Sequence, residues 1–228
     1  MPHAVIVAHG QPSNPAPAEA ALARFARQID SLCHRVSVHS ATLAAPDALE
    51  TCLDELHGDI AIYPLFMAKG WFVTKALPKR LGSRSVRILD PLGIDPQLPF
   101  LVKSSLHQKL ENLGWSASDT DLVIAAHGSG RSNNPASVAD GFADTLGQLV
   151  TFKSTRTGFV EQSPSIAESA SGCGEKALCL PFFACTGGHV LEDVPQELAR
   201  ANFAGQVMPV ISELPQVEQH IAAILDAI

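Results

Sequence analysis

The side chains best suited to chemistry in this chain are two histidines and one glutamate, each placed after an apolar run. His127 follows LVIAA, Glu161 ends the segment GFVE, and His189 follows ALCLPFF by way of a Gly-Gly pair. Two imidazoles and one carboxylate suit a borderline divalent cation such as Co²⁺, Fe²⁺, Ni²⁺ or Zn²⁺. Because three protein ligands leave coordination positions open for exchange, the set indicates a transit or catalytic site. In an alternative interpretation, Glu161 acts as a base and not as a ligand.

Gly187 and Gly188 stand directly before His189. They carry no side chain, which leaves room for a flat or bulky ligand to approach a metal held there. Taken singly, each histidine is more often a hydrogen-bonded structural residue, and a glutamate after a strand is more often a surface residue or a helix cap. A shared site is favoured because all three residues occupy matched positions in one half of a repeated chain.

The repeat is visible as similar segments that recur in the same order. VIVAHGQPSNP begins at Val5 and VIAAHGSGRSNNP begins at Val123, an offset of 118 residues. YPLFMAKGWFVTKALPKRL aligns with LPFFACTGGHVLEDVPQEL at an offset of 117 residues. Constant spacing over several landmarks predicts a tandem duplication of one fold. We therefore predict an amino-terminal domain over 1–115 and a carboxy-terminal domain over 116–228.

Each half alternates short apolar runs with segments of helical periodicity, which predicts alternating strands and helices. Such an order indicates two tandem doubly wound α/β domains with parallel sheets, and we expect a cleft between them. Ligands of such sheets gather at the carboxyl ends of the strands. The expected strands lie near 3–8, 36–41, 60–66, 86–89, 121–126, 155–160, 177–183 and 206–210. The expected helices lie near 16–32, 46–57, 72–82, 96–112, 135–149, 163–171, 189–202 and 215–227.

The first half serves as an internal control for the candidate site. It keeps His9 at the position of His127, but aligning the prolines places Leu43 opposite Glu161, and Phe72 stands opposite His189. The metal site is therefore predicted in the second half alone.

The first half carries cations where the second half carries the candidate ligands. Residues 1–118 contain 11 Lys and Arg against 10 Asp and Glu, while residues 119–228 contain 5 against 13. One interpretation is an ordinary solvated helix face. The other is a wall that meets a polyanionic ligand, with hydrogen bonds added by Ser129 and Arg131 from the opposite loop. The cations are Lys69, Lys75, Lys79 and Arg80.

Composition excludes several classes of protein. The 228 residues are 46% hydrophobic and 17% charged, which argues against disorder, and a net charge of −7 argues against a nucleic-acid partner. No apolar run approaches the ~20 residues of a membrane span, and no signal peptide is apparent, so we expect a cytoplasmic protein without a membrane partner. Five cysteines without a CxxC motif indicate free thiols. The absence of GxxxxGK[ST], of a full GxGxxG and of GxSxG argues against nucleotide and serine-hydrolase chemistry.

Three segments carry a resemblance to a known family. AHGSGRSNNP, FVEQSPSI and LPFFACTGGHVLEDVP, in this order, resemble the class II tetrapyrrole chelatases, in particular the sirohydrochlorin cobaltochelatases and ferrochelatases. The resemblance covers essentially the whole chain, and PFF…GGHV…D-P is its specific part. It implies insertion of a divalent metal into sirohydrochlorin or a related tetrapyrrole, with Co²⁺ or Fe²⁺ as the main candidates and Ni²⁺ as a further one. No nucleotide is required, and the pathway is that of cobalamin or siroheme.

The same resemblance implies roles for individual residues. His127 and His189 would bind the incoming metal, and Glu161 would assist as ligand or base. The macrocycle would lie in the cleft, with its carboxylates near cationic side chains. The residues expected to contact it are Ser129, Arg131, Gly187, Gly188, His9, Lys69 and Lys75. A monomer or a homodimer is compatible with fused halves, and a non-catalytic metal or tetrapyrrole carrier remains the alternative function.

Overall fold

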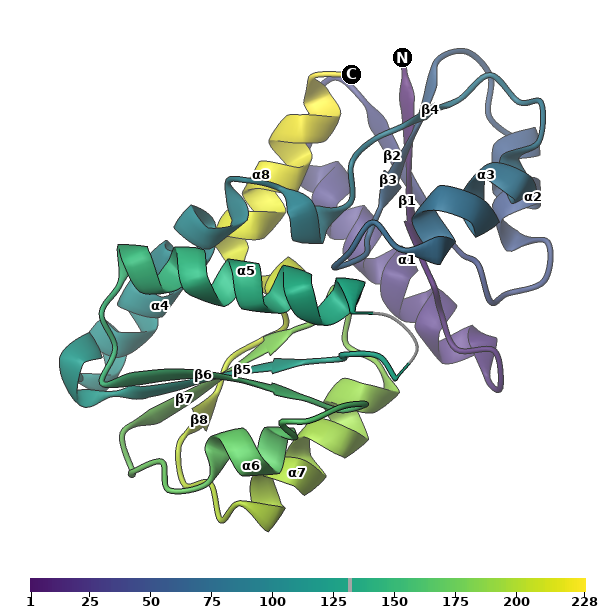
Figure 1. The fold of residues 1–228 in the computed structure, drawn as a ribbon. Helices are drawn as coiled ribbons and strands as arrows, with labels where there is room; N and C mark the ends of the chain where they lie inside the picture. Colours follow the sequence, from purple (N-terminus) through teal and green to yellow (C-terminus); the bar gives the residue numbers. More distant parts are fainter. Residues whose placement is uncertain (131–132) are drawn as a thin grey trace. The chain divides into compact units, whose positions relative to one another are not determined.

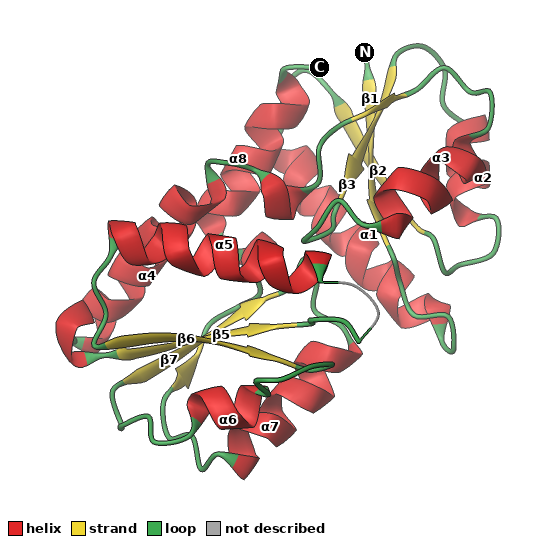
Figure 2. Cartoon of the chain, in the orientation of Figure 1, coloured by secondary structure: helices red, strands yellow, loops and turns green. Residues whose placement is uncertain are grey.

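The computed structural model describes residues 1–130 and 133–228, and within them two parallel sheets have the same strand order (Figures 1 and 2). In the first sheet the order is β2-β1-β3-β4, and in the second it is β6-β5-β7-β8. The predicted α/β class with two parallel sheets is confirmed. The first four strands are β1 (His3–Ala8), β2 (Ser37–Thr42), β3 (Ile60–Pro64) and β4 (Arg87–Ile88). The second four are β5 (Asp121–Ala126), β6 (Ser154–Phe159), β7 (Ala177–Phe182) and β8 (Gln206–Val207).

The helices follow the predicted order, and most begin or end within a few residues of the expected positions. The main differences are at the edge strands, which are only two residues long, and at two segments that open with a π turn before an α-helix. The α-helices are α1 (Pro15–Leu32), α2 (Ala48–Asp54), α3 (Leu77–Leu81), α4 (Leu98–Leu113), α5 (Asn134–Leu149), α6 (Ile166–Ala170), α7 (Val194–Arg200) and α8 (Pro215–Asp226). The π turns are η1 (Phe72–Ala76) and η4 (His189–Asp193), and the short 3₁₀ turns are η2 (Leu92–Ile94), η3 (Ala117–Asp119) and η5 (Ile211–Glu213). No helix in the described part of the chain is long and apolar enough to cross a membrane.

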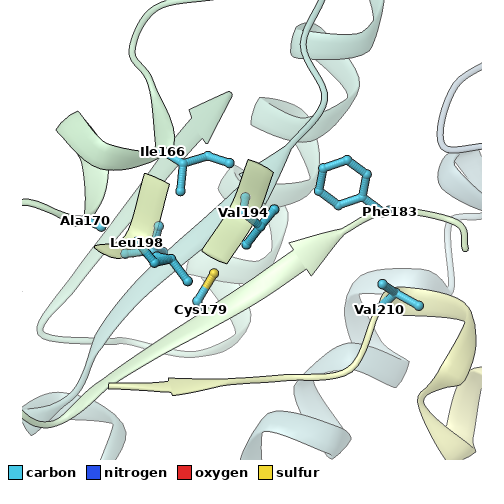
Figure 3. Packing of buried hydrophobic residues seen from close by; sticks show 9 residues of the cluster. Ile166, Ala170, Cys179, Phe183, Val194, Leu198 and Val210 are labelled. Carbon is cyan, nitrogen blue, oxygen red and sulfur yellow. The ribbon is translucent and has the colours of Figure 1, made fainter. Parts of the chain in front are cut away.

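The second sheet is covered on both faces, as its uninterrupted apolar strands require. Every residue of β5 and of β7 is buried. Helices α6 and α7 lie over one face and α5 lies over the other (Figure 1). Figure 3 shows how Ile166, Val194 and Leu198 from these helices meet Cys179 of β7 in one apolar cluster. Full burial of one such side chain stabilises the fold by about 1.5–3 kcal/mol, which holds the strand ends in place beneath the candidate site.

Packing divides the chain into two compact units that differ from the sequence repeats at their last helices. The first unit comprises Met1–Asp95 and Glu218–Ile228, and the second comprises Pro96–Val217. Most of α8 therefore packs in the first unit, where Gln28 of α1 donates to both carboxylate oxygens of Glu218 at 2.8 Å. Helix α4 packs in the second unit, beside α5. The domain boundary after residue 115 and the cleft between the halves stay predictions.

Candidate metal centre

His127 lies at the carboxyl end of β5, in a turn that depends on the glycine after it. Its Nδ1 lies 3.0 Å from the carbonyl oxygen of Gly128. Because a carbonyl oxygen only accepts, Nδ1 carries the proton and Nε2 presents its lone pair. Gly128 has φ of +67°, and a Cβ there would come within 2.9 Å of Cβ of Phe159. The Ala-His-Gly motif is thus a strand end and a left-handed glycine that together orient an imidazole.

Glu161 lies beside this turn because the neighbouring strand β6 ends at the same edge of the sheet. The N–H of Glu161 donates to the carbonyl oxygen of His127 at 3.0 Å. Oε2 of Glu161 lies 3.8 Å from Nδ1 of His127, which is too long for a hydrogen bond. The carboxylate is 48% exposed and the imidazole of His127 42% exposed, so both are accessible to a ligand.

His189 begins the π turn η4, which leads into α7. The N–H of Val194 donates to the carbonyl of His189, five residues back. Pro195 accounts for the wide turn, because its ring lacks an N–H and would clash with the carbonyl four residues earlier in a regular α-helix. Nδ1 of His189 lies 2.6 Å from Oδ2 of Asp193. The Asp193 carboxylate accepts a hydrogen bond from Nδ1–H of His189, and Nε2 of His189 is again left with its lone pair.

The three candidate side chains come together. His127, Glu161 and His189 each offer a ligand atom, and these atoms lie within 4.8 Å of one another. The two imidazole rings pack edge to face, with centroids 4.4 Å apart and an interplanar angle of 83°. Among the described residues this is the one group of three or more such ligands. The geometry can hold one cation on two imidazole nitrogens and one carboxylate oxygen; metal binding by these residues stays a prediction.

The first unit repeats the same frame without the ligands. Nδ1 of His9 lies 2.8 Å from the carbonyl oxygen of Gly10, and the His9 ring packs on Phe72 with centroids 4.3 Å apart. The prediction that Leu43 is the counterpart of Glu161 was wrong. The N–H of Ala44, not that of Leu43, donates to the carbonyl of His9. The alignment on prolines failed because the second half has one more residue between the strand and the next helix.

The other predicted contact residues lie in different surroundings. A Cβ on Gly187 or Gly188 would meet no atom within 4 Å, so space is open beside His189. Ser129 follows the His127 turn, and its N–H donates to Oε1 of Gln162 at 2.9 Å. Arg131 lies outside the described residues.

The cations of the first unit differ in how they are held. Lys69 is exposed and pairs with Asp90 at 2.6 Å, and Lys75 is exposed on the π turn η1. Arg80 donates to the Glu50 carboxylate and to the carbonyl of Leu43, which makes it part of the fold. The hydrogen bond from Arg80 holds the pKa of Glu50 below its usual range, although partial burial opposes the shift. Lys69 and Lys75 therefore stay as candidates for a ligand, and Arg80 does not.

Two further residues near His189 were not assigned a role from the sequence. Asp193 contacts His189, and its signal was the spacing of four residues in GGHVLEDVP, which places both side chains on one face of a turn. Cys185 precedes His189 by four residues, but burial and then Glu213 raise the pKa of its thiol to about 12. In the metal-free protein the thiol is therefore protonated at neutral pH, and Cys185 is not part of the group formed by His127, Glu161 and His189.

Comparison with known proteins gives a consistent set of relatives. The CbiX family model matches residues 3–109 and again residues 121–227. The chain is 21% identical over 223 residues to a protein of Halobacterium salinarum described as a "probable sirohydrochlorin cobaltochelatase", covering 85% of this chain and 75% of that protein.

Solved structures show the same likeness. A structure of CbiX, described as the terminal enzyme for biosynthesis of siroheme in denitrifying bacteria, matches with a TM-score of 0.87 and 42% identity over 99% of this chain and 98% of that one. SirB from Bacillus subtilis with Fe³⁺ matches at 0.71 and 17% identity over 98% and 94%. SirB from Bacillus subtilis subspecies spizizenii with cobalt matches at 0.68 and 17% identity over 99% and 94%. The two SirB structures support the fold alone.

Proposed function

Because the chain belongs to the CbiX family, we propose that it is a chelatase that inserts a divalent metal ion into sirohydrochlorin or a related modified tetrapyrrole, without a nucleotide. Siroheme or cobalamin biosynthesis is the corresponding pathway. The observation that carries the proposal is the group of His127, Glu161 and His189 at the strand ends of the second unit. A cytoplasmic location and a monomeric or dimeric state are predictions from the sequence.

The metal is the substrate, and the first step is its capture. One ring nitrogen from each of His127 and His189 and a carboxylate oxygen of Glu161 supply three ligand atoms. These nitrogen and oxygen donors accommodate both Co²⁺ and Fe²⁺, and the solved SirB structures contain cobalt or Fe³⁺. Because all three side chains are about half exposed, the ion stays accessible to the acceptor.

The second step moves the ion into the macrocycle and removes two protons. Metallation replaces two pyrrole N–H protons by one M²⁺, so two protons must leave the ring. We assign Glu161 as the third ligand in the loaded state. When the ion departs, its carboxylate is released and can accept one of the two protons; the other passes to an imidazole or to solvent.

The test is metal insertion by the purified protein. Anaerobic sirohydrochlorin is mixed with Co²⁺ or Fe²⁺ and catalytic amounts of protein, and the absorption change of the macrocycle is followed against an enzyme-free control. We expect many turnovers per chain, and loss of the protein-dependent rate in His189→Ala. Stoichiometric binding without turnover would instead identify a metal or tetrapyrrole carrier.

A further inference from the structure

The first unit carries an aromatic cluster at the position where the second unit carries its metal ligands. Phe72, the counterpart of His189, is the centre of this cluster. Its ring packs edge to face with His9 at a centroid distance of 4.3 Å and with Trp71 at 5.2 Å. Phe66 stacks on it at 6.0 Å with an interplanar angle of 18°. Two imidazoles in one unit thus correspond to a group of four rings in the other.

Trp71 is the outer ring of this cluster, and the fold does not require it. Trp71 is 65% exposed. Its counterpart in the second unit is Gly188, and the two residues have nearly the same backbone conformation, with φ and ψ of −56° and −38° against −50° and −49°. A residue without a side chain therefore builds the same turn. A large apolar ring that packs edge to face with Phe72 and stays mostly exposed is a surface suited to a flat ligand.

Cationic side chains flank this ring. Lys75 follows Trp71 by four residues on the π turn, and Lys79 follows Lys75 by four, so the three lie along one side of the segment. Lys69 precedes Trp71 by two residues and pairs with Asp90, but both side chains are more than half exposed. An exposed ion pair contributes only about 0–1 kcal/mol, so Lys69 can exchange Asp90 for a ligand carboxylate at small cost.

We propose that Trp71, supported by Phe72, binds one face of the flat conjugated macrocycle, while Lys69 and Lys75 contact its peripheral carboxylates. The inference rests on the proposed function for the identity of the ligand, a tetrapyrrole with several carboxylate side chains. It assigns the first unit a role in macrocycle binding that is separate from metal capture by His127 and His189. The first unit, which lacks the metal ligands, then binds the macrocycle, because its strand ends present aromatic rings and ammonium groups.

Binding can be measured without metal and without turnover. The chain has two tryptophans, Trp71 and Trp115. Trp115→Phe leaves Trp71 as the only indole, and Trp71→Phe leaves Trp115. Titration with metal-free sirohydrochlorin is expected to quench the fluorescence of the Trp115→Phe protein in a saturable way. The Trp71→Phe protein serves as the matched control: it still binds the macrocycle, and its Trp115 is expected to be quenched much less at saturation than Trp71 is in the Trp115→Phe protein. Equal titration curves for the two proteins would overturn the inference.

Kinetics provide the second measurement. Trp71→Ala is expected to raise KM for the macrocycle about 3- to 10-fold, because one aromatic contact is lost, with kcat and KM for the metal unchanged. Trp71→Phe keeps a ring and is expected to recover most of the affinity. Phe100→Ala removes an exposed ring on α4 and is expected to have no effect. A KM for Trp71→Ala within twofold of wild type contradicts the inference while leaving metal insertion intact. Absence of insertion by the wild type would refute the proposed function and leave the fluorescence result to decide on macrocycle binding.

Discussion

Oδ2 of Asp193 lies 2.6 Å from Nδ1 of His189, and the two positions change together between the halves of the chain. They are the first and last residues of the π turn η4, and the first and last residues of the equivalent turn η1 are Phe72 and Ala76. The carboxylate is therefore absent where the imidazole is absent. This pattern indicates that Asp193 serves His189 and is not required by the turn.

Replacing Asp193 by Asn should weaken Co²⁺ binding about 10- to 100-fold, because the imidazole loses the acceptor that fixes its tautomer and orientation. The dissociation constant from a Co²⁺ titration is the measurement. Glu192→Gln removes a neighbouring carboxylate of the same turn and is the matched control. An unchanged affinity in Asp193→Asn, with a weaker one in Glu192→Gln, would reverse the assignment.

Either His127→Ala or His189→Ala should lower Co²⁺ affinity by more than about 100-fold. Each removes a ligand of the metal, whereas Asp193 acts only through its hydrogen bond with His189. Enzyme-dependent insertion should be lost with it. His107→Ala, at an exposed position on α4, is the control and should bind Co²⁺ as the wild type does. If both site variants kept wild-type affinity, the metal would have to bind elsewhere.

Gly128→Ala should destabilise the protein by at least about 1 kcal/mol, because φ of +67° is strained for any L residue and the new Cβ would press on Phe159. Gly188→Ala is the comparison, since that residue is in the right-handed helical region and its Cβ would meet no neighbour. Thermal or urea unfolding of the two variants checks the difference. Equal stabilities would mean that the turn at His127 can relax without cost.

Asp121 should make folding stability depend on pH in the acid range. Its side chain is 2% exposed, and burial alone would raise its pKa. Hydrogen bonds from the Ser154 hydroxyl at 2.7 Å, the Gly174 N–H at 3.1 Å and the Lys153 ammonium at 3.2 Å outweigh burial and hold the pKa below its usual range. The stabilisation is therefore present above the unfolded pKa of about 3.9 and is lost as pH falls below it.

Asp121→Asn tests this linkage. The variant should lose about 1–3 kcal/mol of unfolding free energy at pH 7, because charge-assisted hydrogen bonds are removed. The difference from wild type should shrink at pH 3, because below the unfolded pKa the unfolded wild-type chain takes up a proton that the folded carboxylate resists. Urea unfolding at the two pH values provides both numbers, and a difference that stays constant between them would argue against the lowered pKa.

Lys69→Ala and Lys75→Ala should raise KM for the macrocycle, and the effect should be larger at low salt than at 0.5 M NaCl, because added ions screen exposed charges. Stability should change by less than about 1 kcal/mol, given the exposure of the Lys69 pair with Asp90. Lys176→Ala, at the residue that precedes β7, is a control that removes a cation far along the strand from its carboxyl end. A salt-independent KM, equal in all three variants, would exclude a role for these cations.

Much of the fold was predictable because the determining signals are local. Apolar runs such as LVIAA and ALCLPFF are buried on both faces of a parallel sheet, and the periodicity between them is that of amphipathic helices. The repeated landmarks then predicted that both sheets share one order. The π turns were missed because a π turn and an α-helix have similar apolar patterns. Pro78 and Pro195 favour the wider turn through a steric clash, which the apolar pattern does not reveal.

The kinds of side chain at the strand ends could be read from the amino-acid sequence: His127, Glu161 and His189 in one half, and Phe72 with nearby lysines in the other. Which atoms meet depends on how the chain packs. The backbone hydrogen bonds show that Ala44 is the counterpart of Glu161. In the folded chain Arg80 donates to Glu50, and His189 donates to Asp193. Packing also places most of α8 in the first unit and α4 in the second. An amphipathic pattern shows that one face of a helix must be buried. It does not show against which sheet or helix that face packs, because the rest of the chain forms the apolar surface that covers it.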